Sequence, residues 1–276
     1  MAYGDIEISE DSGEPIELFV FERPQQVFRY TNHDTDINFL GNTFGSIPIK
    51  RSRVEATTDL GKSGVTIEMV RNATFAQLFI ANIPAETFNV TIYRTHLSSV
   101  EDSIILWQGR VVNAKLLEST AEIYCQPLYT SIKRPGLRRA YQINCPHVLY
   151  GPSCKVVRDS LAITTTNTTI AGNTITSPDL VETDALLGPT WYTGGYVEIT
   201  SGGAVDRRFI TNYDNLSGSV TLNLPFKALA NNSEITVYPG CDRVVTTCSL
   251  KFNNLDNFGG FPYIPQKNPM DGTPIF

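Results

Sequence analysis

Four of the five cysteines form two pairs that lie far apart in the chain. Cys145 and Cys154 have eight residues between them, and Cys241 and Cys248 have six. Thiolates bind zinc and iron–sulfur clusters, and both kinds of centre accept four cysteines. Structural zinc usually takes cysteines separated by about two to four residues, so these wider loops favour a bulkier cluster. Two disulfides, or ordinary buried cysteines, are the alternatives that the spacing leaves open.

Two further residues have side chains of the metal-binding kind. His147 is close enough to Cys145 in the sequence to be either an alternative ligand or a capping side chain, and we favour the capping role. The fifth cysteine, Cys125, lies in a strand-like sequence and is interpreted as a small core residue. The three histidines are far apart and no hydrolase or zinc-protease motif surrounds them, so we expect that the chain is not an enzyme.

A basic segment precedes the first cysteine pair. Residues 133–139 carry two lysine or arginine residues at each end. In a chain of net charge −6, this segment is interpreted as a solvated linker whose cations lie near an anionic metal–thiolate centre. Arg138 and Arg139 are then expected to donate hydrogen bonds or to balance charge at that centre.

The composition limits the partners. The 276 residues are 41% hydrophobic and 18% charged, which is typical of a globular chain of about two domains. Lys and Arg total 22 against 28 Asp and Glu, the wrong sign for neutralising phosphates, so we expect no nucleic-acid sequence recognition. No apolar run approaches the ~20 residues that span a bilayer, and residues 1–14 lack the features of a signal peptide. We therefore expect no membrane span and a chain that begins in the cytoplasm.

The elements that position the cysteines are predicted to be mainly β. Period-two alternation indicates strands, and phenylalanines at helical spacing indicate one short helix within residues 73–80. Thr-, Asn- and Gly-rich segments with turn signals indicate a small β-barrel or sandwich inserted between the cysteine pairs. The predicted organisation is a β-rich domain over residues 1–130, a basic and Cys-rich linker over 131–156, the inserted β domain over 157–240, and the second cysteine pair with an extended Pro/Gly-rich tail over 241–276.

The insertion has a geometrical consequence for the cysteines. Inserted domains commonly begin and end at neighbouring points, so we expect the two cysteine pairs to meet. Within the inserted domain, Trp191, Tyr192 and Tyr196 suit either core packing or stacking on a sugar. We favour core packing because large aromatic side chains are mostly buried.

Three motifs together carry a family resemblance. They are the sequence Cys-Pro-His-Val-Leu-Tyr-Gly-Pro-Ser-Cys over residues 145–154, the later cysteine pair, and Asn-Phe-Gly-Gly-Phe over residues 257–261. This combination resembles the minor tail protein L family of lambda-like phages, which includes tail hub proteins of siphophages and of gene transfer agents. The resemblance covers most of the chain, and the leading β domain looks like the hub domain of that family.

The resemblance implies a structural virion protein of the tail tip, assembled in the host cytoplasm, that connects the tail tube to the host-adhesion apparatus. Its implied partners are the distal tail protein, the central hub or receptor-binding fibre protein and the tape measure protein, and its implied assembly is a homotrimer. The family also implies an iron–sulfur cluster of the [4Fe–4S] type, with zinc as the alternative. The implied ligands are Cys145, Cys154, Cys241 and Cys248.

Two other functions compete with the structural one. A tail-associated cell-wall hydrolase would need a catalytic set that the sequence does not display. A carbohydrate-binding receptor module would use the aromatic side chains of the inserted domain. The sequence also departs from the family pattern at Lys155, where relatives often have glycine, and this departure bears on local backbone freedom.

Overall fold

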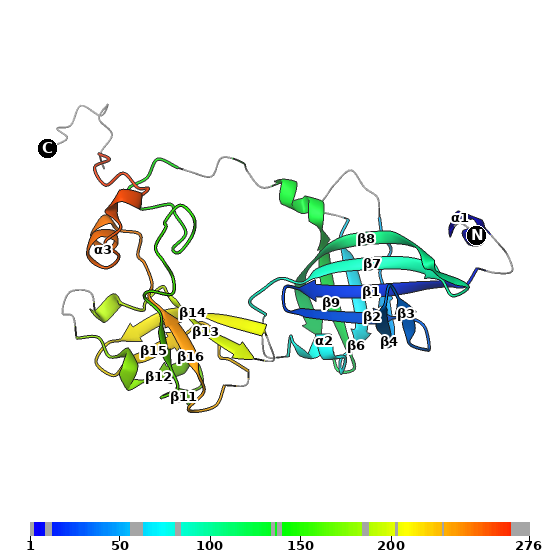
Figure 1. The fold of residues 1–276 in the computed structure, drawn as a ribbon, viewed down its shortest axis with the longest axis horizontal. Helices are drawn as coiled ribbons and strands as arrows, with labels where there is room; N and C mark the ends of the chain where they lie inside the picture. Colours follow the sequence, from blue (N-terminus) through cyan, green and yellow to red (C-terminus); the bar gives the residue numbers. More distant parts are fainter. Residues whose placement is uncertain are drawn as a thin grey trace. The chain divides into compact units, whose positions relative to one another are not determined.

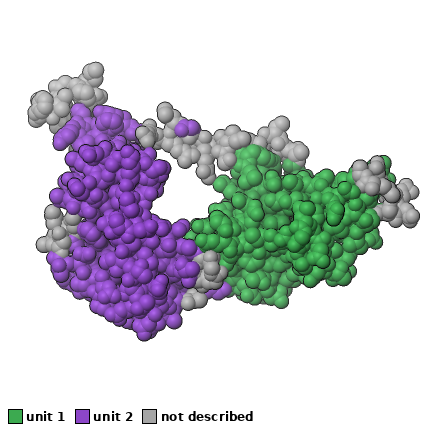
Figure 2. Space-filling view, in the orientation of Figure 1, with its two compact units in different colours: residues 1–135, 202–204 green, residues 136–201, 205–276 purple. Residues whose placement is uncertain are grey.

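The structure is a computed structural model, and it describes residues 3–8, 13–55, 63–80, 84–133, 136, 140–183, 188–201, 204–227 and 229–265. The chain divides into two compact units, which are coloured separately in Figure 2. Unit 1 comprises residues 1–135 with 202–204, and unit 2 comprises residues 136–201 and 205–276. The described residues are mainly β-structure, as the sequence predicts (Figure 1). Among them, no helix combines the length and the apolar character needed to span a bilayer.

The described part of unit 1 is built on a nine-stranded sheet in the order β3-β4-β2-β1-β7-β8-β9-β6-β5. Neighbouring strands are antiparallel, except that β2 and β4 are parallel. The strands are β1 (Pro15–Arg23), β2 (Gln26–Thr31), β3 (Ile37–Phe39), β4 (Asn42–Ser46), β5 (Ile49–Arg51), β6 (Val65–Val70), β7 (Asn89–His96), β8 (Ser99–Leu116) and β9 (Thr120–Pro127). The helices are α1 (Tyr3–Glu7), α2 (Thr74–Gln77) and the 3₁₀ helix η1 (Leu128–Lys133).

The described core of unit 1 forms two clusters, and the larger one packs strands of the sheet against α2. Alternation along β6 buries Val65, Ile67 and Met69 on one face, as a period-two pattern requires. On α2, Phe75 is fully buried and stacks on Phe21 of β1 with ring centroids 4.2 Å apart. The short helix predicted within residues 73–80 is therefore confirmed as Thr74–Gln77, and residues 78–80 continue as turns. Cys125 is 3% exposed in this core, which confirms its interpretation as a core residue.

The described part of unit 2 contains a seven-stranded sheet in the order β10-β16-β13-β14-β15-β12-β11. The strands are β10 (Ile163–Thr165), β11 (Thr169–Ala171), β12 (Thr174–Thr176), β13 (Tyr196–Ser201), β14 (Ala204–Asp214), β15 (Ser219–Leu222) and β16 (Ile235–Tyr238). Helices of this unit are α3 (Val245–Leu250) and the 3₁₀ helices η2 (Pro178–Leu180), η3 (Gly188–Thr190) and η4 (Leu255–Asn257).

Two aromatic residues of unit 2 take part in its core. Tyr192 is fully buried, and its ring packs edge-on against that of Tyr213 at 5.0 Å. Trp191 is partly buried against the same core. Tyr196 stacks on Tyr238 of the neighbouring strand with centroids 4.6 Å apart. Core packing is thus confirmed for Tyr192, because a ring without exposed surface is not available to stack on a sugar.

The segment after the sheet carries the second cysteine pair and leads into the Pro-rich tail that is expected to be extended. It begins with α3, whose first turn is stabilised by Asp242, because this carboxylate accepts hydrogen bonds from the Val244 N–H and the Thr247 hydroxyl, both at 2.9 Å. The chain then packs as far as Phe261, whose ring lies 4.3 Å from that of Tyr141. The prolines at 269 and 274 lie outside the described residues.

Candidate functional site

Both cysteine pairs lie in the two segments that flank β10 and β16, the first and last strands of the seven-stranded sheet in the chain. We call the place where these two segments meet the base of the sheet. β10 and β16 pair antiparallel, with Ile163 opposite Val237, so the chain enters and leaves the sheet at neighbouring strands although these are far apart in sequence. Cys145 and Cys154 precede β10, Cys241 follows β16, and Cys248 lies in α3. The sheet topology therefore brings the two segments that carry the cysteines side by side.

The four cysteines line one cavity of about 260 Å³. Liquid water occupies about 30 Å³ per molecule, so the cavity has room for a group of several atoms. Cys145 and Cys248 are buried, Cys154 and Cys241 are half-buried, and all five cysteines of the chain are free thiols. The two disulfides that the spacing left open as an alternative are therefore not formed in this structure. Other residues that line the cavity are His147, Tyr150, Tyr196, Arg243, Phe252 and Phe258.

The cysteines around the cavity are donors that both zinc and iron–sulfur clusters accept. Within the described part of the chain, no group of three or more His, Cys, Asp or Glu side chains is arranged to hold one metal ion. A four-cysteine zinc site needs all four sulfurs about 2.3 Å from the same atom. In an iron–sulfur cluster each thiolate binds a different iron, so the sulfurs surround a larger volume. The donor set, four free thiols that line one cavity, is therefore of the kind that either group accepts.

N–H groups point at three of the sulfur atoms. The backbone N–H of Gly259 donates to Cys145 Sγ at 3.4 Å, and that of Arg243 donates to Cys241 Sγ at 3.3 Å. The side-chain amide of Asn254 lies 3.8 Å from Cys154 Sγ and also donates to the Cys154 carbonyl. Hydrogen bonds of this kind stabilise thiolates and help to set the reduction potential of a cluster.

Burial governs the protonation of two of the thiols. Desolvation, together with smaller contributions from the other cysteines around the cavity, raises the pKa of Cys248 to about 11. Desolvation also raises the pKa of Cys241, against the hydrogen bond from the Arg243 N–H. Both groups are therefore neutral thiols at neutral pH in the metal-free chain. A metal bound by these thiols would have to displace their protons.

A buried lysine lies next to the cysteine segments. The ammonium of Lys251 donates to the backbone carbonyls of Trp191 and Gly240, the latter at 2.7 Å. Burial lowers its pKa to about 8, and the nearby Cys241 is the first of the groups that act in the opposite direction. Sequence analysis missed this residue, because its partners are distant in the chain and a lone lysine gives no signal.

The Asn-Phe-Gly-Gly-Phe motif is explained by close packing against the first cysteine segment. A Cβ atom on Gly259 would lie 2.6 Å from the ring of His147, and one on Gly260 would lie 2.3 Å from the carbonyl oxygen of Ile143. The His147 ring donates from Nδ1 to the carbonyl of Asn257 at 3.1 Å. This is the capping role that the sequence favours for His147, and it holds the two segments together.

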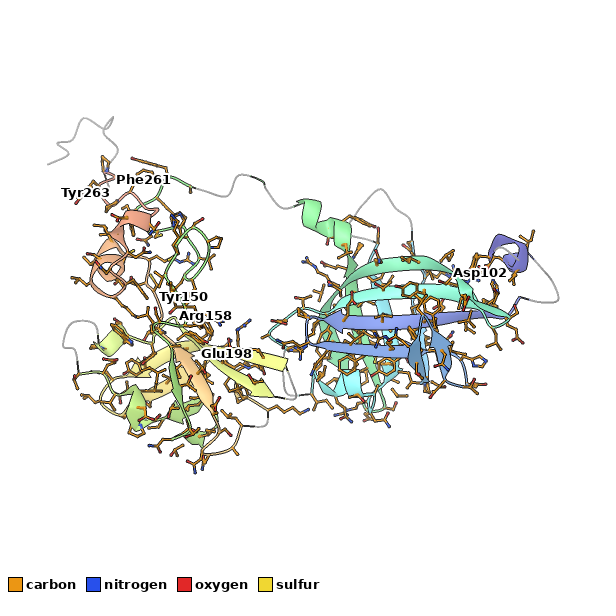
Figure 3. The ribbon with its side chains drawn as sticks, in the orientation of Figure 1. Asp102, Tyr150, Arg158, Glu198, Phe261 and Tyr263 are labelled. Atoms are coloured by element: carbon orange, nitrogen blue, oxygen red, sulfur yellow. The ribbon has the colours of Figure 1, made fainter. Side chains whose placement is uncertain are left out.

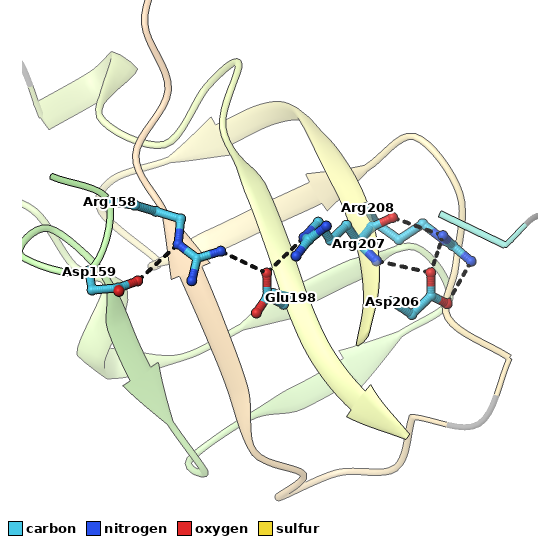
Figure 4. Close-up of polar contacts among 6 residues, drawn as sticks. All are labelled: Arg158, Asp159, Glu198, Asp206, Arg207 and Arg208. Carbon is cyan, nitrogen blue, oxygen red and sulfur yellow. Dashed lines mark hydrogen bonds and ion pairs between the residues drawn. The ribbon is translucent and has the colours of Figure 1, made fainter. Parts of the chain in front are cut away.

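Tyr150 and Arg158 connect the first cysteine segment to the sheet (Figure 3). The Tyr150 hydroxyl donates to the carbonyl of Pro239 at 2.7 Å, and its ring lines the cavity. Arg158 lies 3.6 Å from Glu198 of β13, which also binds Arg207 at 2.8 Å (Figure 4). Because Arg158 is about one-third exposed, we assign this ion pair an orienting role and little net stability.

Two further sequence features near the site have different outcomes. Lys155 has a φ of +60°, the left-handed region that glycine adopts without strain, which explains why glycine suits this position. Of the basic segment 133–139, Arg138 and Arg139 lie outside the described residues, so their expected role stays a prediction.

Two protein families match separate parts of the chain. Residues 19–157, about half of the chain, match the family described as baseplate hub protein, N-terminal attachment domain. Residues 190–268 match the family described as phage conserved hypothetical protein BR0599. The first match contains one cysteine pair, and the second match contains the other.

Two individual proteins are similar to this chain. An uncharacterized protein of Xylella fastidiosa (strain 9a5c) is 25% identical over an alignment of 161 residues that covers 54% of this chain and 34% of that protein. The chain thus matches about a third of the length of that relative. A chain in the virion of a native gene transfer agent particle has the same fold, with a TM-score of 0.77 over 99% of both chains and 19% identity.

Proposed function

Because the chain belongs to the baseplate hub family with the N-terminal attachment domain, we propose that it is a hub subunit whose four paired cysteines hold a [4Fe–4S] cluster. As a member of this family it is a structural component of a virion tail. The narrower position at the tail tip, and the resemblance to the minor tail protein L family, are parts of the proposal.

One observation supports the cluster most strongly: all four paired cysteines line the same cavity, while Cys125 lies in a different core. The cysteines come from two segments separated by a complete sheet, so their meeting is a property of the fold and not of local sequence. When bound, a cluster would supply four metal–sulfur bonds that join these segments.

The residues of this chain divide the work of holding such a group. Cys145, Cys154, Cys241 and Cys248 would provide the thiolates. The N–H groups of Gly259 and Arg243 orient and stabilise two of the sulfurs, and Tyr150 lines the cavity. Together these residues would hold the segment that carries Cys241 and Cys248 at the base of the sheet.

The test is anaerobic purification of the full chain, followed by iron, sulfide and zinc analysis and a visible absorption spectrum. We expect about four irons and four sulfides per chain, with the broad visible absorption of an iron–sulfur cluster. Cys241→Ser is expected to lose the cluster and to lower the melting temperature, because it removes one ligand. Cys125→Ser is the matched control, since it changes a buried thiol outside the cavity and should keep the iron content.

Other outcomes have definite meanings. One zinc per chain would keep the four-cysteine site and replace the cluster by a structural ion. Absence of both metals from the wild-type chain would refute the site, and unchanged iron in Cys241→Ser would refute the ligand assignment. Neither result would change the family, which rests on residues 19–157.

We further propose that the subunit assembles as a homotrimer between the distal tail protein and the central hub or receptor-binding fibre protein, around the tape measure protein. Closed rotational symmetry is the usual arrangement of identical subunits, and a ring leaves a central passage. Light scattering on the purified chain, alone and with the distal tail protein, measures the number of copies. A chain that stays monomeric at every concentration and with this partner would contradict the trimer.

A further inference from the structure

Asn254 contacts one cysteine of each pair. Its side-chain Nδ2 donates to the Cys154 carbonyl at 2.6 Å and lies 3.8 Å from Cys154 Sγ. Its backbone N–H donates to the carbonyl of Cys248 at 3.0 Å, and Cys248 Sγ lies 3.3 Å from its backbone carbonyl oxygen. Cys154 precedes β10 and Cys248 lies in α3, so a single residue joins the two segments at their cysteines.

The side chain of Asn254 is turned away from the role that its backbone position favours. The residue directly precedes the 3₁₀ helix η4, and an asparagine at such a position ordinarily accepts a hydrogen bond from a backbone N–H of the first turn. No side-chain bond of this kind is formed by Asn254. Because the Cys154 carbonyl can only accept, the amide must present its NH₂ group to the first cysteine segment. The orientation therefore serves Cys154 and not the helix.

A second asparagine holds this orientation. Asn257 Nδ2 donates to Asn254 Oδ1 at 2.6 Å, and the Asn257 N–H donates to the Asn254 backbone carbonyl at 3.2 Å. The Asn257 carbonyl in turn accepts from the His147 ring at 3.1 Å. Asn257 and His147 both line the four-cysteine cavity. The Asn254 amide is thus fixed between Cys154 and Asn257 before any group enters the cavity, which is the arrangement that lets outer residues orient ligands.

We propose that Asn254 is a positioning residue of the four-cysteine site, which fixes the separation of Cys154 and Cys248 and donates an N–H to the Cys154 sulfur. The inference rests on the proposed metal site but not on the identity of the metal. The bonds to the carbonyls of the two cysteines do not involve sulfur, so they are available whether the site is empty or loaded. The contact with Cys154 Sγ acts on the metal–sulfur bond, because hydrogen bonds to ligand sulfurs help to set the properties of a metal–thiolate centre.

The experiment compares Asn254→Leu with the wild-type full chain, because leucine has a similar shape and neither a donor nor an acceptor in its side chain. Each protein is prepared metal-free and titrated with Zn²⁺ alone against a competing chelator. We expect the variant to bind Zn²⁺ about 10- to 100-fold more weakly, the usual effect of removing a residue that orients metal ligands. The matched control is Asn253→Gly, which removes an exposed amide from the same loop at a φ of +44°, where glycine is unstrained. Its Zn²⁺ affinity should stay within about twofold of wild type.

A second readout separates positioning from a purely structural role. Reconstitution of both proteins with ferrous iron and sulfide gives the reduction potential of a cluster. We expect this potential to fall in Asn254→Leu, because the more negative, reduced form gains most from an N–H donor to sulfur. If the chain holds zinc instead, Co²⁺ replaces zinc as the probe, and its thiolate-to-metal charge-transfer band should move to lower energy. A residue that only supports the loop would lower the melting temperature of the metal-free chain and leave the potential and the band unchanged.

Each remaining outcome counts against a definite part of the proposal. A Zn²⁺ affinity within about twofold of wild type in Asn254→Leu would refute the positioning role while leaving the metal site intact, since Cys241→Ser tests that site separately. Weaker binding with an unchanged potential or band would refute the donation to the Cys154 sulfur. A wild-type chain that takes up neither Zn²⁺ nor iron and sulfide would refute the site and this inference together. Should Asn254→Leu fail to fold, Asn254→Asp keeps the shape and the acceptor for Asn257 without the donor, and the same comparison decides.

Discussion

Gly260→Ala is predicted to separate the Asn-Phe-Gly-Gly-Phe segment from the first cysteine segment. A Cβ at this position would lie 2.3 Å from the Ile143 carbonyl oxygen and 2.8 Å from the Asn144 carbonyl carbon. Both are backbone atoms, so no side-chain rotation relieves the overlap. A folded protein that carries this substitution must therefore move the two chain segments apart.

The cost follows from the contacts that this movement breaks. They are the hydrogen bond from the Phe261 N–H to the Gln142 carbonyl at 2.9 Å, the Gly259 N–H bond to Cys145 Sγ at 3.4 Å, and the ring contact of Tyr141 with Phe261. Each is worth on the order of 1 kcal/mol, so the expected loss is about 3 kcal/mol. For a unit of this size that loss lowers the melting temperature by roughly 10 °C.

Calorimetry of the metal-free chain measures this effect without a contribution from metal binding. Gly136→Ala is the control, because an added Cβ there meets no atom within 4 Å, and its effect should stay within about 0.5 kcal/mol. A Gly260→Ala protein that melts within about 2 °C of the wild type would show that the two segments are not held at this separation.

Two more predictions concern single residues. The Cys125 thiol has a pKa raised to about 12 by burial, so at pH 9, where half of an ordinary thiol is ionised, alkylation of the folded protein should spare it; labelling at this residue without denaturant, detected by mass spectrometry, would contradict its burial. Lys155→Val should destabilise unit 2 by about 1–2 kcal/mol, because a β-branched residue is strained at a φ of +60°, whereas Lys155→Gly should not; urea unfolding of both variants decides, and equal stability would contradict the strained backbone.

Local patterns predict the parts of the fold that depend on local sequence. Alternation identifies β6, and the phenylalanine spacing identifies α2, because both signals arise within a few residues. The sequence pattern does not predict α3, because Thr246 and Thr247 are β-branched and weaken a helical pattern. The start of this helix depends instead on the side chain of Asp242. Long-range contacts, not propensity, decide the structure after residue 241.

The candidate site could likewise be predicted from the sequence only in part. Residue type alone pointed to the four paired cysteines, and the idea of an inserted domain led to the expectation that they meet. The pairing of β10 with β16, which brings them together, has no signature in the sequence, because it joins strands far apart in the chain. The hydrogen bonds of Lys251, and the close packing that requires glycine at positions 259 and 260, join segments that are distant in the chain. The sequence alone therefore does not predict them.

The base of the seven-stranded sheet also has a mechanical consequence. Two hydrogen bonds close it, from the Cys145 N–H to the Arg243 carbonyl and from the Phe261 N–H to the Gln142 carbonyl. A pulling force applied to the chain on either side of these bonds is transmitted directly across the base, and the sheet lies off the load path. The sheet therefore carries no tension until the base has ruptured, and any metal–sulfur bonds formed there would add their strength to that clamp.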